Sequence, residues 1–332
     1  MKILVVGGNG MLGRKLIAKL IQNSIDETID IETITSVDVG SNQSEINKIP
    51  AQVKFVTADI TNFKVCQQLI SNKPDVIFHL AAVVSGEAES NFEIGYEVNL
   101  DATRNIFEAI RAESNHYYPR VIFTSSAAVY GGPFPELIDD EYILQPTTSY
   151  GIQKVIGELL VNDYSRLGFF NGIGLRLPTI CVRPGKPNAA ASGVFSNIIR
   201  EPLAGQEAIL TVSKDTRMVF ASPQSAVDNL IHALNVDTTL LGNRRTLMMP
   251  GITATIEEEI QALRRVAGDK IVALIKESID PRAQKFVENW NFSPFTADRA
   301  KGLGFTCEQS FEEIIIKHIN NELGGEILGI KL

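Results

Sequence analysis

The stretch Gly7-Gly8-Asn9-Gly10-Met11-Leu12-Gly13 joins two segments of different hydrophobic period. Before it, Ile3–Val6 is a short aliphatic run typical of a buried strand, and Leu12–Gln22 has the apolar spacing of an amphipathic helix. Glycine at positions 7, 10 and 13 lets the chain turn tightly and approach a pyrophosphate, which would lie at the helix N-terminus. A plain tight turn could carry the same glycines, but the place between a strand and a helix favours a dinucleotide site.

The first half of the chain continues this alternation of short apolar runs and helical patterns. Further predicted strands are Thr33–Val37, Val53–Thr57, Val76–Leu80, Val121–Thr124 and Gly174–Leu177, and the clearest further helices are Tyr96–Ala112 and Tyr150–Arg166. This rhythm is typical of βαβ units that build a parallel sheet. Because the strands are nearly all apolar, helices are expected to cover both sheet faces. We therefore predict an α/β protein with a Rossmann-type, doubly wound parallel sheet.

The pattern changes after Leu177, where prolines and glycines mark a long irregular stretch. A compact sheet has no need of such a segment, which predicts a smaller C-terminal substrate lobe. Later segments with the pattern of a return to the sheet are Val219–Ala221, Gln224–Leu234 and Thr246–Met249. The predicted organisation is a dinucleotide-binding domain over 1–178, with 215–250 returning to it, and a substrate lobe of 179–214 and 251–332.

Composition argues against several classes of partner. The chain has 332 residues, of which 44% are hydrophobic and 21% charged, as is ordinary for a globular protein. A net charge of -8 argues against nucleic acid or an anionic membrane surface as the main partner. Cys66, Cys181 and Cys307 are widely spaced without a CxxC pattern, so we expect reduced thiols and no metal site. No apolar run has the length of a signal-peptide core or a membrane span, and we expect a cytoplasmic protein.

The second predicted strand is followed directly by an acidic residue, Asp38. A carboxylate at this point can accept both ribose hydroxyls of adenosine and repels a 2′-phosphate. No arginine follows to neutralise such a phosphate, so the sequence favours NAD over NADP as the cofactor. A turn residue without a ligand is the alternative interpretation.

Tyr150 and Lys154 lie four residues apart, on one face of a predicted helix. The pKa of a free phenol is about 10, and a neighbouring ammonium favours the phenolate, which makes the tyrosine a usable base for an alcohol proton. Ser126 follows the predicted strand Val121–Thr124, at the edge where parallel sheets bind ligands, and could hydrogen-bond the same substrate oxygen. An exposed helix face would give the same tyrosine–lysine spacing, but the serine favours a catalytic set of all three residues.

Together these residues resemble the extended short-chain dehydrogenase/reductase (NAD-dependent epimerase/dehydratase) family. The matching pieces are 7–13, Asp38, Asp59-Ile60, His79-Leu80-Ala81-Ala82, Asn99, 124–131 and the Tyr150/Lys154 pair. The resemblance implies that Tyr150 is the acid/base, that Lys154 binds the nicotinamide ribose and lowers the pKa of the tyrosine, and that Ser126 orients the substrate. The further cofactor contacts that it implies are Gly7, Gly10, Met11, Leu12, Gly13, Asp59, Ile60, Ala81, Ala82, Asn99 and Pro178.

The resemblance implies three further properties. His79 would pack under the cofactor as a strand residue, and Asn99 would support the proton relay. The helices Tyr96–Ala112 and Tyr150–Arg166 would pair with their symmetry mates in a four-helix bundle, which makes a homodimer.

Three departures count against the nucleotide-sugar substrates of many family members. Ala127-Ala128 replaces the Asp-Glu pair of the dehydratases, Arg217–Pro223 keeps only the arginine of an epimerase segment, and Leu177–Asn188 lacks the usual Asn-x-Tyr-Gly-Pro. The runs 81–89 and 182–192 are instead similar to the D-erythronate dehydrogenase subgroup. That similarity implies NAD-dependent oxidation of the C2 hydroxyl of a four-carbon sugar acid to the 2-oxo acid.

A small carboxylate needs a fork of donors, and Arg183, Lys186 and Arg217 are the cations of the segments expected to form the pocket. We expect Arg183 or Arg217 to anchor the acid, with Arg183 ahead, although each could equally be an ordinary surface charge. Ser85 is a candidate for a substrate hydroxyl. The alternatives are a nucleotide-sugar 4-epimerase, an L-threonine dehydrogenase of the same fold, and, from another class, a non-catalytic NAD-sensing regulator.

Overall fold

The computed structural model describes residues 1–40, 51–113, 117–185, 192–288, 291–327 and 330–331. The chain divides into two compact units. The first consists of Met1–Val129, Thr148–Arg176 and Val227–Leu247, and the second of Tyr130–Thr147, Leu177–Ala226 and Met248–Leu332. The second unit thus contains four segments that the sequence places with the dinucleotide-binding domain, namely 130–147, 177–178, 215–226 and 248–250.

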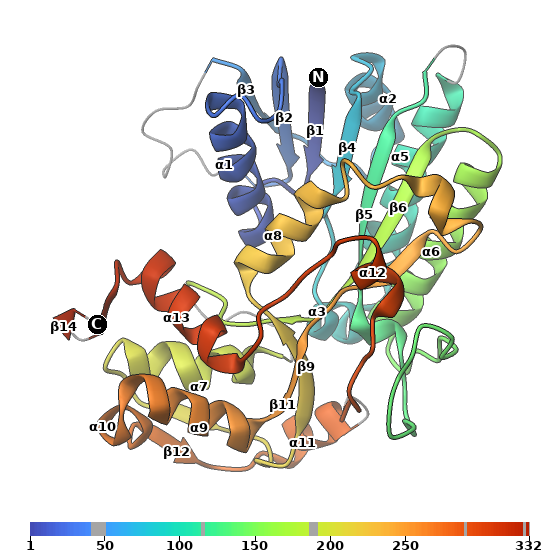
Figure 1. Cartoon of the computed structure of the whole chain (residues 1–332). Coiled ribbons are helices and arrows are strands. Elements are labelled where there is room, and N and C mark those ends of the chain that lie inside the picture. The colour runs from blue at the N-terminus through green and yellow to red at the C-terminus, as the bar shows by residue number, and fades with distance from the viewer. Residues whose placement is uncertain (41–50, 114–116, 186–191, 289–290, 328–329, 332) are drawn as a thin grey trace. The chain divides into compact units, whose positions relative to one another are not determined.

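The first unit is built around a seven-stranded sheet (Figure 1). Its strands are β1 (Lys2–Val6), β2 (Thr33–Asp38), β3 (Val53–Thr57), β4 (Val76–His79), β5 (Arg120–Ser126), β6 (Asn171–Leu177) and β10 (Thr246–Met248). They follow the order β10-β6-β5-β4-β1-β2-β3, and β1 pairs in parallel with both β2 and β4. The strand order therefore reverses beside β1, which is where such sheets bind ligands. The predicted Rossmann-type sheet is confirmed.

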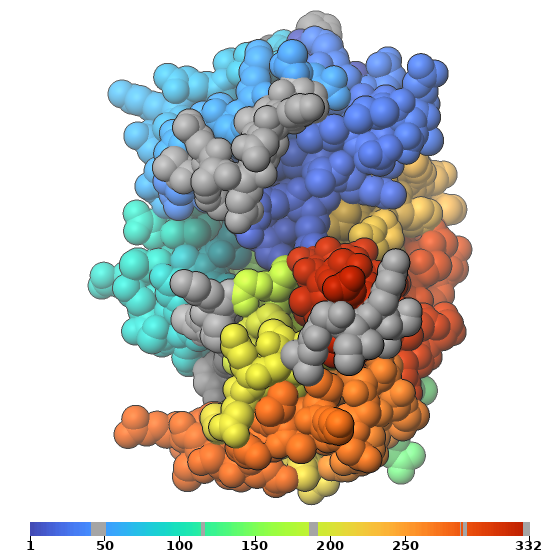
Figure 2. All heavy atoms as spheres, turned by 90° about the vertical axis from the view of Figure 1, so that its left-hand side faces the viewer, coloured from blue at the N-terminus to red at the C-terminus, as the bar shows by residue number. Residues whose placement is uncertain are grey.

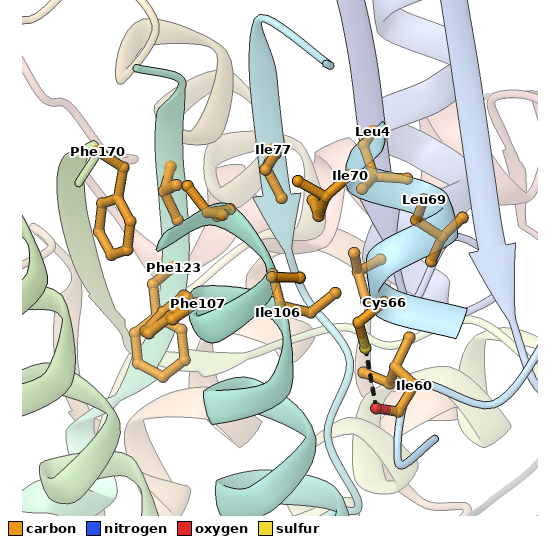
Figure 3. Close-up of a cluster of buried hydrophobic side chains, with 14 of the residues drawn as sticks. Leu4, Ile60, Cys66, Leu69, Ile70, Ile77, Ile106, Phe107, Phe123 and Phe170 are labelled. Carbon is orange, nitrogen blue, oxygen red and sulfur yellow. Dashed lines mark hydrogen bonds between the residues drawn. The ribbon is translucent and has the colours of Figure 1, made fainter. Parts of the chain in front are cut away.

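Helices α2 (Phe63–Ser71), α5 (Ala102–Ala112) and α6 (Ser149–Arg166) contribute to one hydrophobic core on the sheet. In Figure 3 the side chains of Ile70 from α2 and Ile106 from α5 lie close to Ile77 of β4. All three side chains are fully buried. The amphipathic helix α1 (Met11–Ile25) buries its own apolar stripe, which includes Leu16.

Local sequence sets where α6 begins. The Thr148 side chain accepts a hydrogen bond from the main-chain N–H of Gly151 at 3.1 Å. This bond satisfies one of the N–H groups that a helix start leaves without a partner. Tyr150 therefore lies in the first turn of α6, and Lys154 in the next.

The region predicted as a single helix, Tyr96–Ala112, has a more complex form. Helix α4 (Phe92–Tyr96) leads into a π-helical turn, η1 (Glu97–Asp101), which leads into α5. Such turns are rare and are found frequently at functional sites. This one carries Asn99.

The second unit contains a sheet in the order β11-β9-β7 and a separate parallel pair, β12 with β8. The strands are β7 (Thr179–Ile180), β8 (Ala208–Leu210), β9 (Arg217–Ala221), β11 (Ile252–Thr255) and β12 (Ile275–Glu277). The expectation that Val219–Ala221 rejoins the main sheet is wrong, because β9 pairs with β7 and β11. The main sheet does regain Thr246–Met248 as β10.

The helices of the second unit are α7 (Gly193–Leu203), α9 (Ile256–Ala267), α10 (Asp269–Val272), α11 (Pro281–Glu288), α12 (Asp298–Gly302) and α13 (Phe311–Glu322). Figure 2 shows the residues of α9 and α10, in orange, as part of one continuous surface of this unit. Other short elements of the chain are α3 (Ser85–Ser90), η2 (Ala127–Val129), α8 (Pro223–His232), η3 (Thr238–Leu241), β13 (Glu326–Ile327) and β14 (Ile330–Lys331). In the described ranges, no helix combines the length and the apolar character needed to cross a membrane.

Candidate active site

The turn between β1 and α1 needs glycine at two positions. Gly7 has a φ of +86°, and a Cβ there would lie 2.6 Å from the main-chain nitrogen of Ala81, just after β4. A Cβ on Gly13 would lie 2.4 Å from the carbonyl oxygen of Gly7. Helix α1 starts after Gly10, and no side chain of the described residues caps it. Its first N–H groups therefore remain for an anion, which fits the pyrophosphate of a dinucleotide.

Asp38, at the end of β2, is held beside this turn. Its Oδ2 accepts the main-chain N–H of Asn9 at 2.9 Å, and its Oδ1 accepts that of Gly40 at 3.4 Å. The residue remains half-buried rather than enclosed. A carboxylate in this place fits the predicted recognition of the adenosine ribose next to the phosphates.

Asp59 and Ile60, which follow β3, point their side chains into different surroundings. Asp59 is exposed, and its Oδ1 accepts the main-chain N–H of Thr61 at 2.9 Å. Ile60 lies in the hydrophobic core, and its carbonyl oxygen accepts a bond from the Cys66 thiol at 3.2 Å (Figure 3). Of the two, only Asp59 presents a side chain that a ligand at the surface can reach.

The loop after β4 is fixed by Asn99. The Asn99 Oδ1 accepts the N–H of Val83 at 2.8 Å, and its Nδ2 donates to the carbonyl oxygen of Val83 at 3.3 Å and to Gln153 Oε1 at 2.7 Å. Because Oδ1 accepts an N–H, the orientation of both amides is determined. The side chain of Asn99 is thus occupied in holding the loop that carries Ala81 and Ala82, and it ties this loop to α6.

His79 is linked to the π-helical turn through the hydroxyl of Thr103. Thr103 Oγ1 donates to the carbonyl oxygen of Asn99 at 2.8 Å, and His79 Nε2 lies 2.8 Å from the same hydroxyl. Burial, together with the charge of Lys154, lowers the pKa of His79 to about 3, so the ring is neutral. Since the Thr103 hydrogen is given to Asn99, His79 must donate from Nε2. This arrangement suits a packed strand residue, as the resemblance implies.

Lys154 is buried between the end of β5 and the first turn of α6. Its ammonium donates to the carbonyl oxygen of Thr124 at 2.8 Å and lies 5.6 Å from the centroid of the Tyr150 ring. Burial lowers the pKa of Lys154 to about 8, and the charge of Glu158 opposes this decrease. The structure thus places a buried cation beside the phenol ring, as the predicted catalytic set requires.

Ser126 is the accessible member of two adjacent serines at the end of β5. It is half-buried, whereas Ser125 is 3% exposed. The Ser126 Oγ accepts the main-chain N–H of Ala128 at 3.1 Å. A hydroxyl that accepts in this way still has its own hydrogen to donate to a substrate oxygen.

Glu158 of α6 belongs to a buried ion pair that the sequence does not predict. Arg176 of β6 donates from Nη2 to Glu158 Oε2 at 2.7 Å, with side chains that are 12% and 3% exposed. The sequence signal was the place of Glu158, four residues after Lys154 on the same helix face. Its partner on β6 could not be read from spacing.

The two arginines expected to anchor a carboxylate differ in their surroundings. Arg183 donates from Nε to the carbonyl oxygen of Ile180 at 3.0 Å and from Nη2 to Ser192 Oγ at 2.7 Å. Arg217, the first residue of β9, is exposed, and its main-chain N–H donates to Asn291 Oδ1 at 2.9 Å. Within the described part of the chain, its guanidinium makes no hydrogen bond or ion pair.

The other predicted site residues are distributed over both units. Ser85, in the first unit, is half-buried and opens helix α3. Pro178, in the second, is buried between β6 and β7. Lys186 lies outside the described residues.

A glycine turn at the switch point of a parallel sheet, with a buried lysine beside a tyrosine, defines a dinucleotide-dependent enzyme of the short-chain type. The chain belongs to the NAD-dependent epimerase/dehydratase family, whose sequence model matches residues 3–238. NAD is accordingly its cofactor.

Particular relatives are similar over almost the whole chain. A D-erythronate dehydrogenase of Cupriavidus necator is 44% identical over 95% of this chain and 97% of its own length. One of Haemophilus influenzae is 39% identical over 97% of this chain and 100% of its own length. A crystal structure described as a nucleoside-diphosphate-sugar epimerase, from Agrobacterium tumefaciens, is 52% identical, covers 98% of this chain and 95% of its own, and superposes with a TM-score of 0.93.

Proposed function

We propose that the protein is a D-erythronate dehydrogenase, which oxidises the C2 hydroxyl of this four-carbon sugar acid to the 2-oxo acid and reduces NAD. The observation that carries the proposal is the full-length identity of 44% and 39% to two enzymes of that name. The intact Tyr150, Lys154 and Ser126 set supports it, because a protein that only sensed NAD would need the glycine turn but not the base.

Residues of the first unit supply the acid–base chemistry. Bound NAD would accept the hydride that leaves C2. The glycine turn and Asp38 would hold its phosphates and adenosine ribose, and Lys154 its nicotinamide ribose. Tyr150 removes the hydroxyl proton as a phenolate, which the buried Lys154 ammonium stabilises. Ser126 donates a hydrogen bond to the same substrate oxygen and so orients it.

For the substrate carboxylate we propose Arg217 in place of Arg183. A guanidinium grips a carboxylate best with two parallel N–H groups, such as those of Nε and Nη2. In Arg183 both of these atoms already donate to Ile180 and Ser192, which makes it a structural residue. The exposed fork of Arg217 has no such commitment among the described residues.

We also propose that the protein works as a cytoplasmic homodimer. Helix α6 exposes 39% of Ile152 and 59% of Leu159, and Phe92 of α4 is 60% exposed. Apolar side chains on adjoining helices are what a subunit interface would cover. Light scattering at micromolar concentration tests the dimer, which a monomeric mass would exclude.

The proposed cytoplasmic location rests on the three free cysteines, which suit a reducing compartment.

The decisive experiment is a substrate screen with the purified protein and NAD, followed by NADH absorbance. D-Erythronate should be oxidised with a higher kcat/KM than L-erythronate, L-threonine or UDP-galactose. The 52% identical structure described as an epimerase makes the sugar nucleotide an essential arm. Interconversion of UDP-sugars without net NADH formation would overturn the proposal, and so would faster oxidation of threonine.

A further inference from the structure

We propose that Glu158, held by its ion pair with Arg176, is a positioning residue of the reaction. It fixes the end of β5, which carries Ser126, and it keeps a negative charge one helical turn from Lys154. The inference rests on the proposed function in one respect, the role of Tyr150 as the acid/base.

The Glu158 carboxylate is enclosed and fully engaged. The residue is 2% exposed. Its Oε1 accepts Ser125 Oγ at 2.5 Å and Arg176 Nε at 2.9 Å, and its Oε2 accepts Arg176 Nη2 at 2.7 Å. The two parallel bonds from Arg176 fix the plane of the carboxylate, because both groups are rigid forks. The Ser125 hydroxyl is therefore bound to an acceptor that cannot turn away.

Two contacts, one helical turn apart, bind α6 to successive residues of β5. Lys154 holds the carbonyl oxygen of Thr124, and Glu158 holds the hydroxyl of Ser125. The next residue is Ser126. Any slide or rotation of α6 along the strand would have to break both bonds at once. The pair of contacts therefore sets the position of Ser126 relative to the helix that carries Tyr150.

The charge of Glu158 acts on Lys154 as well. Burial lowers the pKa of Lys154 to about 8, and Glu158 is the anion that opposes this decrease. Among the residues that the structure describes, the other ionisable groups near the ammonium are Tyr150 on α6 and His79 on β4, and His79 is neutral. Arg176 of β6 lies behind Glu158 and is bonded to it. Without the carboxylate, the ammonium would be lost at a lower pH, and Tyr150 would lose the cation that favours its phenolate.

If this buried ion pair had no part in the reaction, removal of one partner would change the stability of the fold alone. The second unit provides a matched control for that case. Glu308 is also buried, and its Oε1 accepts Ser225 Oγ at 2.7 Å and Lys317 Nζ at 2.7 Å. Glu308→Gln thus makes the same chemical change, next to a serine and a cation, on elements other than α6 and β5.

The test compares Glu158→Gln with Glu308→Gln in the full chain. For Glu158→Gln we expect kcat to fall by about tenfold or more, a smaller loss than the roughly 100-fold or more expected when the base itself is removed. The alkaline limb of its kcat–pH profile should move down by roughly one unit. A readout without substrate is tyrosinate absorbance in the ultraviolet, where the step that Tyr150→Phe removes should move to higher pH. Glu308→Gln should leave both profiles in place.

The proposal would be overturned if Glu158→Gln folded and kept the parental kcat, the parental kcat–pH profile and the parental pH of the tyrosinate absorbance step. If that variant does not fold, Ser125→Ala decides, because it removes one hydroxyl and keeps the ion pair. Its kcat should fall by about threefold or more through lost positioning alone, and a parental value would overturn the inference. Absence of D-erythronate oxidation by the parent would reject the proposed function instead, since the absorbance titration needs no substrate.

Discussion

The side chain of Asn99 binds both main-chain polar groups of Val83, its N–H at 2.8 Å and its carbonyl oxygen at 3.3 Å. A carboxamide offers an acceptor and a donor side by side, as an edge strand would. The loop that carries Ala81 and Ala82 is therefore held as if by strand pairing, although its partner is a side chain in a π-helical turn.

Asn99→Ala should weaken cofactor binding as well as lower stability, whereas a control variant of similar stability should bind the cofactor normally. Loss of the bonds to Val83 and Gln153 is expected to lower the free energy of unfolding by about 1–3 kcal/mol. The KM for NAD should rise because the loop is no longer fixed. Asn162→Ala is the control, since the Asn162 Oδ1 accepts the main-chain N–H of Arg245 at 3.0 Å, far from the loop after β4 in sequence. An equal loss of stability in both variants with an unchanged KM for NAD would count against the role of Asn99.

Asp38→Ala should raise the KM for NAD and improve the relative use of NADP, because the charge that repels a 2′-phosphate is removed. Asp38→Asn separates this charge from the bond to the glycine turn, since its amide oxygen can still accept the Asn9 N–H. We expect both variants to shift cofactor preference, and only the alanine variant to lose affinity for both cofactors. Initial rates with each cofactor provide the measurement, and a parent enzyme that prefers NADP would contradict the assignment.

Tyr150→Phe should abolish most of kcat and leave the affinity for NAD nearly intact, because only the transition state needs the base. The expected loss is about 100-fold or more. Lys154→Ala should damage both kcat and NAD affinity, since the same side chain is proposed to hold the ribose. Equal and mild losses in the two variants would indicate that this helix face has no part in the chemistry.

Lys154 should also cost the protein stability at neutral pH. A lysine with a pKa of about 8 in the folded state, against 10.5 when unfolded, destabilises the fold wherever it is charged. The penalty is complete below pH 8 and disappears as the pH rises to the unfolded value. Lys154→Met is thus expected to raise the free energy of unfolding at pH 7, by up to about 3 kcal/mol, while it abolishes activity. Urea titrations of parent and variant at pH 7 and 10 provide the measurement, and a variant less stable at pH 7 would refute the expectation.

Arg217→Ala should lower kcat/KM for the sugar acid by about 2–5 kcal/mol of transition-state stabilisation, the range for removing one partner of a charge pair, provided that the bound acid covers the now exposed guanidinium. NAD affinity should be unaffected. Arg183→Ala is expected to lower thermal stability first, because it removes bonds to Ile180 and Ser192. If both variants kept parental kcat/KM on every active substrate, a neutral substrate would become the better explanation.

The sequence was sufficient for the parts of the molecule that depend on local pattern. The strands from Ile3–Val6 to Gly174–Leu177 have the predicted type, and the glycine turn lies where the spacing placed it. The segment Val219–Ala221, predicted to return to the main sheet, lies in β9 of the other sheet, because so short a run carries no information about the strands it pairs with.

The parts that failed depend on contacts between distant residues. The π-helical turn around Asn99 accompanies a bond to Val83, 16 residues earlier, which helical periodicity does not encode. Arg183 and Arg217 are both arginines in segments predicted to form the pocket. Only side-chain geometry shows that Arg183 donates a hydrogen bond to Ser192. The role of Glu158, on α6, could not be predicted for the same reason, because its partners Ser125 and Arg176 come from the strands β5 and β6.

Each compact unit contains one fully buried thiol, Cys66 in the first and Cys181 in the second. Burial raises the pKa of Cys66 to about 12 and that of Cys181 well above its ordinary value, so neither supplies the reactive thiolate while its unit is closed. Alkylation of each cysteine must then wait until its surroundings open. In a Cys307→Ser variant, the labelling rate of Cys66 therefore reports how often the first unit opens, and the labelling rate of Cys181 reports how often the second unit opens.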